Sequence, residues 1–288
     1  MGKRRKDGSR KIYLTLIGFA LASILILVAI DYLPRFATRG NVPPFEEIHH
    51  PPDRSITYEI PISPHGAAAP RIAIIIDDLG YDKSLAREFT DLDLPLTLSI
   101  LPFTPYTRSI AHRAKREGRE IMLHLPMEPR SYPRINPGDG VLLVSMERDT
   151  ILEVLDRNLG EIPFVAGVNN HMGSRFTEDS ELMRIVLKDI QKRDLFFLDS
   201  RTTPKTVGFE LAKEMGIKTG QRNVFLDNNR DVSKIKTQIA ELVKLSKRNG
   251  GAIGIGHPHP EMLQALQETI PSLRDNGIEV VPVSMLLE

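Results

Sequence analysis

Short aliphatic segments alternate with helical stretches from about residue 70 to the end of the 288-residue chain. Strands and crossover helices in alternation predict a parallel sheet, and about seven or eight such units in about 215 residues favour a barrel over an open sheet. The fold class indicated is therefore α/β. The strands are expected near residues 72–76, 96–100, 120–123, 164–168, 195–198, 224–226, 252–255 and 279–282, and the helices near residues 82–91, 106–117, 149–159, 178–193, 205–215, 232–248 and 260–275.

The first of these strands ends in two adjacent carboxylates. The segment from Ile72 to Ile76 is an unbroken aliphatic run, typical of a strand buried on both faces, and Asp77 and Asp78 follow it directly. The carboxyl ends of parallel strands are where α/β folds carry their chemistry. A solvated turn in which an aspartate caps the next helix is the alternative. Because two carboxylates stand here together, we favour a functional site.

Polar side chains that can bind a metal recur after four other expected strands. A lone histidine at a strand end is more often a structural residue with a hydrogen-bond partner. Here several strand ends agree, and in a barrel these ends meet at one rim. The sequence therefore predicts one polar site at that rim. The segments are His124-Leu-Pro-Met-Glu128, Asn169-Asn170-His171, Asp199-Ser200-Arg201 and His257-Pro-His259.

The residue types at this rim suit a catalytic metal ion. The chain contains no cysteine, which excludes disulfides, thiolate metal sites and cysteine nucleophiles and leaves His, Asp and Glu as ligands. Carboxylate and imidazole ligands around an open position are typical of catalytic Zn2+, which lowers the pKa of water and polarises a carbonyl. A second carboxylate beside such a site can act as base, and a histidine across it can act as acid.

The amino terminus has the pattern of a membrane anchor. Residues 1–11 carry six basic residues and one acidic residue, a net charge of +5, and residues 12–30 contain no charge. About 20 apolar residues span a bilayer as a helix, and the positively charged flank stays in the cytoplasm. We therefore expect a cytoplasmic tail over residues 1–11, a single transmembrane helix over residues 12–33 in the lipid bilayer of the cytoplasmic membrane, and the rest of the chain in the periplasm or outside. A cleaved signal peptide is the alternative, but the apolar run is long and no small-x-small cleavage site follows it.

A proline-rich segment separates this anchor from the main domain. Residues 34–70 predict a semi-rigid linker, in which residues 56–60 could form a short edge strand, and the main domain is expected over residues 71–288. The whole chain has a net charge of +1, so the part after residue 11 carries −4. That part offers no electrostatic case for binding nucleic acid.

Taken together, the motifs resemble those of the divergent polysaccharide deacetylases, a bacterial branch related to the NodB-type carbohydrate esterases. The resemblance covers about residues 70–288 and rests on Ile-Asp-Asp-Leu-Gly, His-Leu-Pro-Met-Glu-Pro, Asn-Asn-His-Met-Gly-Ser, Leu-Asp-Ser-Arg and Gly-His-Pro-His-Pro. It implies a distorted (β/α) barrel of about seven parallel strands. It also implies a metal-dependent amide hydrolysis that removes acetyl groups from N-acetylated sugars.

The resemblance further assigns a base and a set of metal ligands. Asp77 would be the catalytic base and Asp78 a ligand. His124 stands at the first position of the His-x-x-x-His motif of the wider NodB-type family, but the second position holds Glu128. Either Glu128 or His171 would then complete the ligand set.

The remaining roles fall on the later strand ends. Asp199 would orient catalytic groups, and His257 would be the catalytic acid. The Arg-containing third motif of the wider family is not recognisable in the segment around Asn170. Substrate contacts are expected from Asn170, Ser200, Arg201 and His259.

The leading interpretation is an anchored, envelope-facing deacetylase of a cell-envelope polysaccharide such as peptidoglycan or an exopolysaccharide, with Zn2+ as the expected divalent metal. A non-catalytic glycan-binding or scaffolding protein on the same barrel is the main alternative. A metal-dependent hydrolase of another ester or amide would use the same ligands. A hydrolase needs a base and an acid together with the metal ligands, whereas a binding protein does not. The presence of both Asp77 and His257 therefore favours an enzyme.

Overall fold

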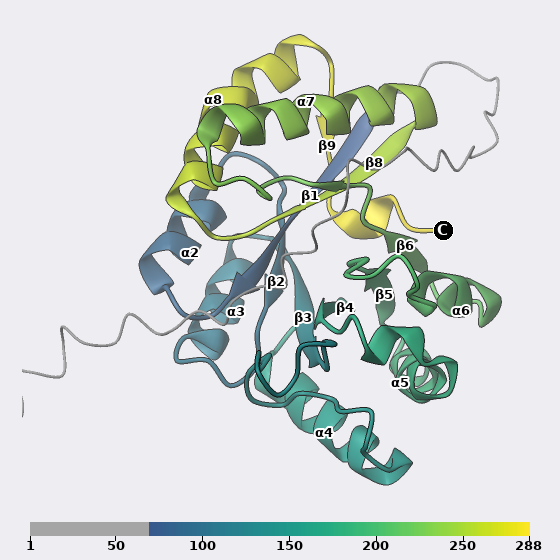
Figure 1. Ribbon diagram of the computed structural model, residues 1–288. Helices are drawn as coiled ribbons and strands as arrows, with labels where there is room; N and C mark the ends of the chain where they lie inside the picture. Colours follow the sequence, from purple (N-terminus) through teal and green to yellow (C-terminus); the bar gives the residue numbers. More distant parts are fainter. Residues whose placement is uncertain (1–68) are drawn as a thin grey trace, which may run out of the picture. The chain divides into compact units, whose positions relative to one another are not determined.

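The computed structural model describes residues 69–288, so the expected membrane helix and nearly all of the expected linker lie outside the described residues. Nine parallel strands form one sheet in the described part, and helices surround it (Figure 1). The strand order is β6-β5-β4-β3-β2-β1-β8-β7, and β9 pairs with β1. The strands are β1 (Arg71–Leu79), β2 (Thr97–Ile100), β3 (Glu120–Met127), β4 (Gly167–Met172), β5 (Phe196–Asp199), β6 (Thr219–Gln221), β7 (Val224–Phe225), β8 (Gly251–Gly256) and β9 (Glu279–Val280).

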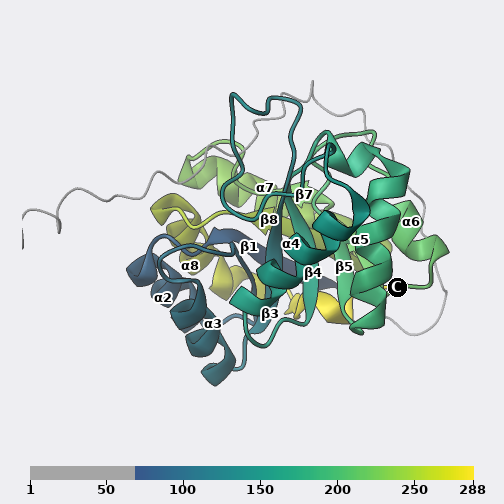
Figure 2. The same cartoon turned by 90° about the horizontal axis from the view of Figure 1, so that it is seen from below.

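Helices alternate with the strands except between β6 and β7, which no helix separates, and the expected α/β barrel is confirmed. Figure 2 shows α2, α3 and α8 on one side of the strands and α5 and α6 on the other. From residue 69 onward, no helix is long and apolar enough to cross a membrane. The helices are α2 (Lys83–Asp91), α3 (Thr107–Arg116), α4 (Arg148–Glu161), α5 (Ser180–Lys192), α6 (Gly208–Glu214), α7 (Val232–Asn249) and α8 (Pro260–Asp275), with 3-10 turns η2 (Phe176–Glu178) and η3 (Val283–Met285).

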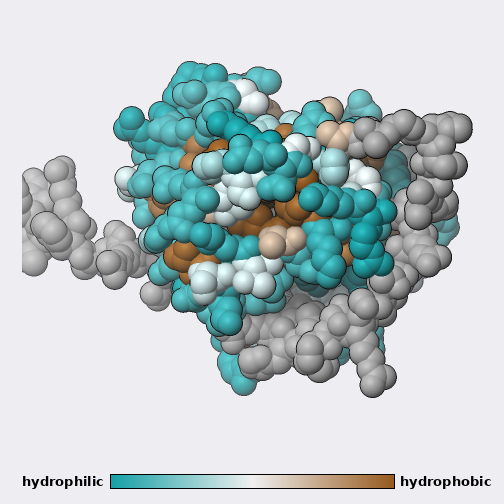
Figure 3. Space-filling view, turned by 90° about the horizontal axis from the view of Figure 1, so that it is seen from above, coloured by the Kyte–Doolittle hydropathy of each residue, from teal (hydrophilic) through white to brown (hydrophobic). Residues whose placement is uncertain are grey.

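Aspartate side chains fix where three of these helices begin. Asp82, Asp179 and Asp231 each precede a helix, and each side chain accepts hydrogen bonds from two backbone N–H groups of the first turn. Such caps satisfy donors that have no partner inside the helix. Seen from the side of α7 and α8, the surface is mostly hydrophilic with some apolar side chains between (Figure 3).

Strand β1 separates two apolar layers. Its residues Ile72, Ile74 and Ile76 belong to the large core between the strands and the helices, whereas Ala73 and Ile75 belong to a small core inside the barrel. Successive side chains of a strand point to opposite faces, so a strand buried on both faces needs apolar residues at every position. The continuous aliphatic run at the start of the domain is therefore the sequence signature of the barrel.

The barrel is not closed by strand pairing, because β6 and β7 stand at opposite ends of the strand order. The carboxyl-terminal segment fills part of this side. Thr219 in β6 exchanges two backbone hydrogen bonds of 3.0 Å with Glu288, and Leu286 and Leu287 pack against the inner core. The tail thus acts as a short pairing partner for the edge strand β6.

Candidate functional site

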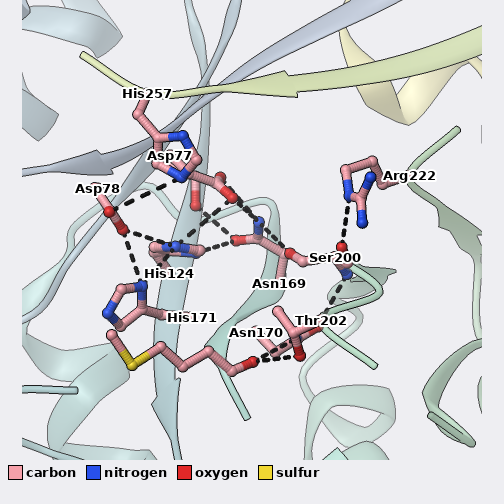
Figure 4. Close-up of polar contacts among 12 residues, drawn as sticks. Asp77, Asp78, His124, Asn169, Asn170, His171, Ser200, Thr202, Arg222 and His257 are labelled. Carbon is pink, nitrogen blue, oxygen red and sulfur yellow. Dashed lines mark hydrogen bonds and ion pairs between the residues drawn. The ribbon is translucent and has the colours of Figure 1, made fainter. Parts of the chain in front are cut away.

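The predicted polar residues converge at the carboxyl ends of the strands. Asp77 and Asp78 come from β1, His124 from β3, His171 from β4 and His257 from the residue after β8. All five residues are buried, and their side chains face one another (Figure 4). The strand ends thus place titratable groups from four segments in one compact site.

A break in β1 lets both of its carboxylates reach this site. Neighbouring residues of a regular strand point to opposite faces, but the pairing of β1 with β2 shifts register between Ile76 and Leu79, and Asp78 has a φ of 55°. Aspartate tolerates this left-handed conformation better than most residues do. As a result, Nε2 of His124 lies 3.6 Å from Oδ2 of Asp77 and 3.1 Å from Oδ1 of Asp78.

Asp78, His124 and His171 form a buried group that could hold a metal ion. The Oδ1 atom of Asp78 lies 2.9 Å from Nδ1 of His171, and the two ring nitrogens of the histidines are 3.2 Å apart. Three atoms about 3 Å from one another can all lie about 2.0–2.1 Å from one ion, which is the distance of nitrogen and oxygen ligands from Zn2+.

The state of Asp78 supports this fit. Its Oδ1 atom is buried, and neither histidine approaches it with hydrogen-bond geometry, so no hydrogen-bond partner is found for it within residues 69–288. Burial favours the neutral acid, but the charge of His171 and the contacts with His124 outweigh it and hold the pKa of Asp78 well below its usual range. The group therefore offers an ionised, buried carboxylate oxygen that accepts no hydrogen bond among the described residues, as a cation site requires.

Asn169 connects Asp77 to His124. Its Nδ2 donates to both carboxylate oxygens of Asp77, at 2.9 and 3.1 Å, and its Oδ1 lies 2.9 Å from Nδ1 of His124 and accepts from Ser99 at 2.6 Å. An amide oxygen only accepts, so Nδ1 of His124 carries the proton and Nε2 keeps its lone pair for a metal. The sequence-based assignment missed Asn169 and named its neighbour Asn170.

His257 is paired with Asp227, which follows β7. The Nδ1 atom of His257 lies 3.0 Å from Oδ1 of Asp227, and its backbone N–H donates to Oδ2 of the same carboxylate at 2.6 Å. The other ring nitrogen, Nε2, lies 3.9 Å from Oδ2 of Asp78. Burial lowers the pKa of His257, but the charges of Asp227, Asp78 and Asp77 outweigh it and raise the pKa to about 9. The carboxylates around His257 therefore favour its protonated form, beside the group of Asp78, His124 and His171.

Asp199 does not take the orienting position that the sequence suggested for it. Its Oδ1 accepts from the backbone N–H of Arg201 at 2.8 Å, and its Oδ2 accepts from Thr206 and from the backbone of Phe209. Burial raises the pKa of this carboxyl. Asp199 therefore organises the loop between β5 and α6, and Asp227, which the sequence analysis did not single out, is the carboxylate that orients His257.

Glu128 lies outside the metal-binding group. Its Oε2 accepts from the backbone N–H of Val144 at 2.7 Å, and its Oε1 accepts from Arg175 at 2.7 Å. Both oxygens are therefore used to hold the loop after β3 and the segment after β4. Of the two alternatives for the third ligand, the geometry favours His171.

Two of the expected substrate-binding residues, Asn170 and Ser200, differ in the contacts that they make. Asn170 ties β4 to the following loops, because its Oδ1 accepts from the backbone of Ser200 and its Nδ2 donates to the carbonyl of Met172, both at 2.9 Å. The Ser200 hydroxyl does reach the site, where it accepts from Asn169 at 3.1 Å.

Arg201 and His259 lie on the loops beside the site. Arg201 has a φ of 52° and is partly exposed, and its carbonyl accepts from Arg222 at 2.9 Å. The ring of His259 lies 6.2 Å from that of His257, and burial and the charge of Arg230 lower its pKa. Both side chains remain candidates for substrate contacts.

Comparisons with known proteins identify a matching family and fold. Residues 74–287 match the model of the family described as divergent polysaccharide deacetylase. The uncharacterized Escherichia coli protein YibQ is 33% identical over 219 residues, which cover 76% of this chain and 68% of YibQ. A solved structure of an uncharacterized Agrobacterium tumefaciens protein has a TM-score of 0.74 and 31% identity, covering 77% of this chain and 91% of that chain.

The fold also extends to more distant proteins. A Bacillus anthracis CE4 family pseudoenzyme, solved as a mutant with restored enzymatic activity, has a TM-score of 0.50 and 13% identity, covering 76% of this chain and 68% of that chain. At this identity the similarity is one of fold alone. The chemistry of the present chain must therefore be argued from its own residues.

Proposed function

The chain belongs to the divergent polysaccharide deacetylase family, and from this premise we propose that it removes acetyl groups from an N-acetylated cell-envelope polysaccharide, with Zn2+ as its ion. The observation that carries the proposal is the arrangement of Asp77 and His257 around the buried group of Asp78, His124 and His171. Asp77 lies 3.6 Å from His124, and His257 lies 3.9 Å from Asp78. A protein that only binds glycans has no need of a base and an acid on a metal-binding group.

Asp77 lies beside the residues that would hold the ion, where it can act as a base on water. A divalent cation held by Asp78, His124 and His171 would lower the pKa of water and polarise the acetamide carbonyl. Asp77 would accept the proton that the water loses as its oxygen bonds to the acetamide carbon. Asn169 donates to both oxygens of Asp77 and so keeps the base in place.

His257 would complete the reaction as the acid. Its raised pKa keeps the ring protonated at neutral pH, and Asp227 fixes the ring through Nδ1, which leaves Nε2–H facing the site. Donation of that proton to the departing nitrogen accompanies cleavage of the C–N bond. The products are acetate and a free amino group on the sugar.

Acetate release tests this function. We expect the full-length protein loaded with Zn2+ to release acetate from chitooligosaccharides or peptidoglycan fragments, and a chelated sample to release none. Acetate is measured enzymatically, and metal content is measured on the same samples. If the metal-loaded protein binds these glycans but releases no acetate from any of them, the glycan-binding alternative replaces the deacetylase.

We also propose that residues 12–33 anchor the protein in the cytoplasmic membrane with the barrel outside the cytoplasm. The proposal rests on the +5 charge of residues 1–11 and the uncharged run over residues 12–30. Alkaline phosphatase fused after residue 70 is expected to be active, because it folds only after export, and β-galactosidase fused at the same point is expected to be inactive. The reverse pattern would contradict this topology.

A further inference from the structure

A basic cleft of about 470 Å³ lies between α2 and α3, which run side by side in the outer ring of helices (Figures 1 and 2). None of the residues that line it is acidic. The volume is within the range of small-molecule sites. The basic residues of the cleft are Lys83, Arg87, His112, Arg113 and Arg116.

Arg113 carries a polar atom without a partner. Its Nη2 pairs with Asp91, but its Nε is buried and has no hydrogen-bond acceptor among residues 69–288. Asp91 is shared, because Nε of Arg87 also contacts it, at 3.4 Å. A buried donor without an acceptor is costly. That donor is not reachable from the cleft, but Arg113 lines the cleft and its side chain is 28% exposed, so the exposed part of the side chain faces an anion bound there.

The cleft has more positive charge than its neighbours neutralise. Lys83 and Arg116 are exposed and make no ion pair within the described part of the chain. The acidic groups paired with a residue of the cleft are Asp91 and, at 3.9 Å from Arg113, Glu117. Guanidinium and ammonium groups gathered in this way match an anion with more than one negative charge and several acceptor oxygens.

We propose that the α2–α3 cleft binds a phosphoryl-bearing anion. A phosphate monoester has the required charge and oxygens, and the cleft is large enough for an organic group attached to the phosphate. Such a ligand can be a soluble sugar phosphate or an anionic lipid headgroup. The cleft is also lined by Ala86 and Ile110, which offer an apolar surface to that organic group.

Two double variants of the full-length protein test the site. Lys83→Ala/Arg116→Ala removes two cations of the cleft, and Lys247→Ala/Arg248→Ala removes the same two residue types from the end of α7. With glucose 1-phosphate as probe, we expect calorimetric binding to weaken about tenfold in the first variant and to be unchanged in the second. Arg113→Lys keeps the charge at that position but removes the planar guanidinium that matches a phosphate, and we expect it to weaken binding as well.

Vesicles separate the two sources of phosphate. Flotation with phosphatidylglycerol vesicles, and with phosphatidylcholine vesicles as the neutral control, is compared between the two double variants. Glucose 1-phosphate binding that depends on Lys83 and Arg116 assigns the site to a soluble ligand, and phosphatidylglycerol binding that depends on them assigns it to a lipid. If the two double variants bind both probes equally well, or if the parent protein binds neither, the proposal is overturned.

Discussion

Asp77→Asn is expected to lower the rate of acetate release by about 10²–10⁴-fold while the protein keeps its metal ion. The substitution preserves the size of the side chain, and an amide oxygen at this position can still accept from Asn169. It removes the capacity to take a proton, which matters mainly in the transition state. Initial rates with chitooligosaccharide are measured alongside zinc content. A fully active, metal-loaded Asp77→Asn protein would rule out Asp77 as the base.

Two further aspartate variants separate the orienting carboxylate from the loop-forming one. Asp227→Asn removes a charge that raises the pKa of His257. If the reaction needs His257 protonated, the rate falls as pH rises through that pKa, so the fall should begin at lower pH in Asp227→Asn than in the parent protein. Asp199→Asn should leave the shape of the pH–rate profile unchanged, because Asp199 bonds within its own loop. A shift in Asp199→Asn alone would reverse the two roles.

The periodicity of the sequence was sufficient for most of the fold. The helices expected over residues 232–248 and 260–275 correspond to α7 and α8 almost to the residue. These elements pack one face against the strands, so their apolar spacing is strong. Strand β6, Thr219–Gln221, was not expected, because it is three residues long and has no aliphatic run. Its place is set by pairing with β5 and with the chain terminus, which no local pattern reveals.

Strand β4 shows why polar sites defeat strand prediction. The strand was expected near residues 164–168 and is found at Gly167–Met172. Its later residues include Asn169, Asn170 and His171, whose polarity argues against a buried strand when the sequence is considered alone. Their burial is possible because they bond to residues of the neighbouring strand ends at the carboxyl rim. Asn169 bonds to His124, and Asn170 bonds to the backbone of Ser200.

The same strand contained a signal that could have identified Asn169. Side chains alternate along a strand, so residues 169 and 171 share a face and residue 170 points away. Once His171 is placed in the site, Asn169 must lie there as well, and Asn170 must not. Asp227 had no comparable signal, because β7 has two residues, and both Asp199, the last residue of β5, and Asp227, two residues after β7, stand at the end of a strand. The choice between these two aspartates required the three-dimensional structure.

His171→Ala and Asp78→Ala are each expected to abolish stoichiometric Zn2+ binding, whereas Glu128→Gln should retain it. Loss of a residue that only supports a ligand typically lowers metal affinity by about 10–100-fold, so loss of a ligand itself should exceed about 100-fold. Glu128→Gln keeps an oxygen for the backbone of Val144 and weakens the ion pair with Arg175, whose side chain is 54% exposed. Gln has the size of Glu128 and keeps the backbone contact, so this variant is the folded control. Zinc content after dialysis and calorimetric titration measure the difference, and circular dichroism confirms folding. Metal loss in Glu128→Gln together with full occupancy in His171→Ala would show that Glu128, at the second position of the His-x-x-x-His motif, is the third ligand. The assignment of His171 would then be wrong.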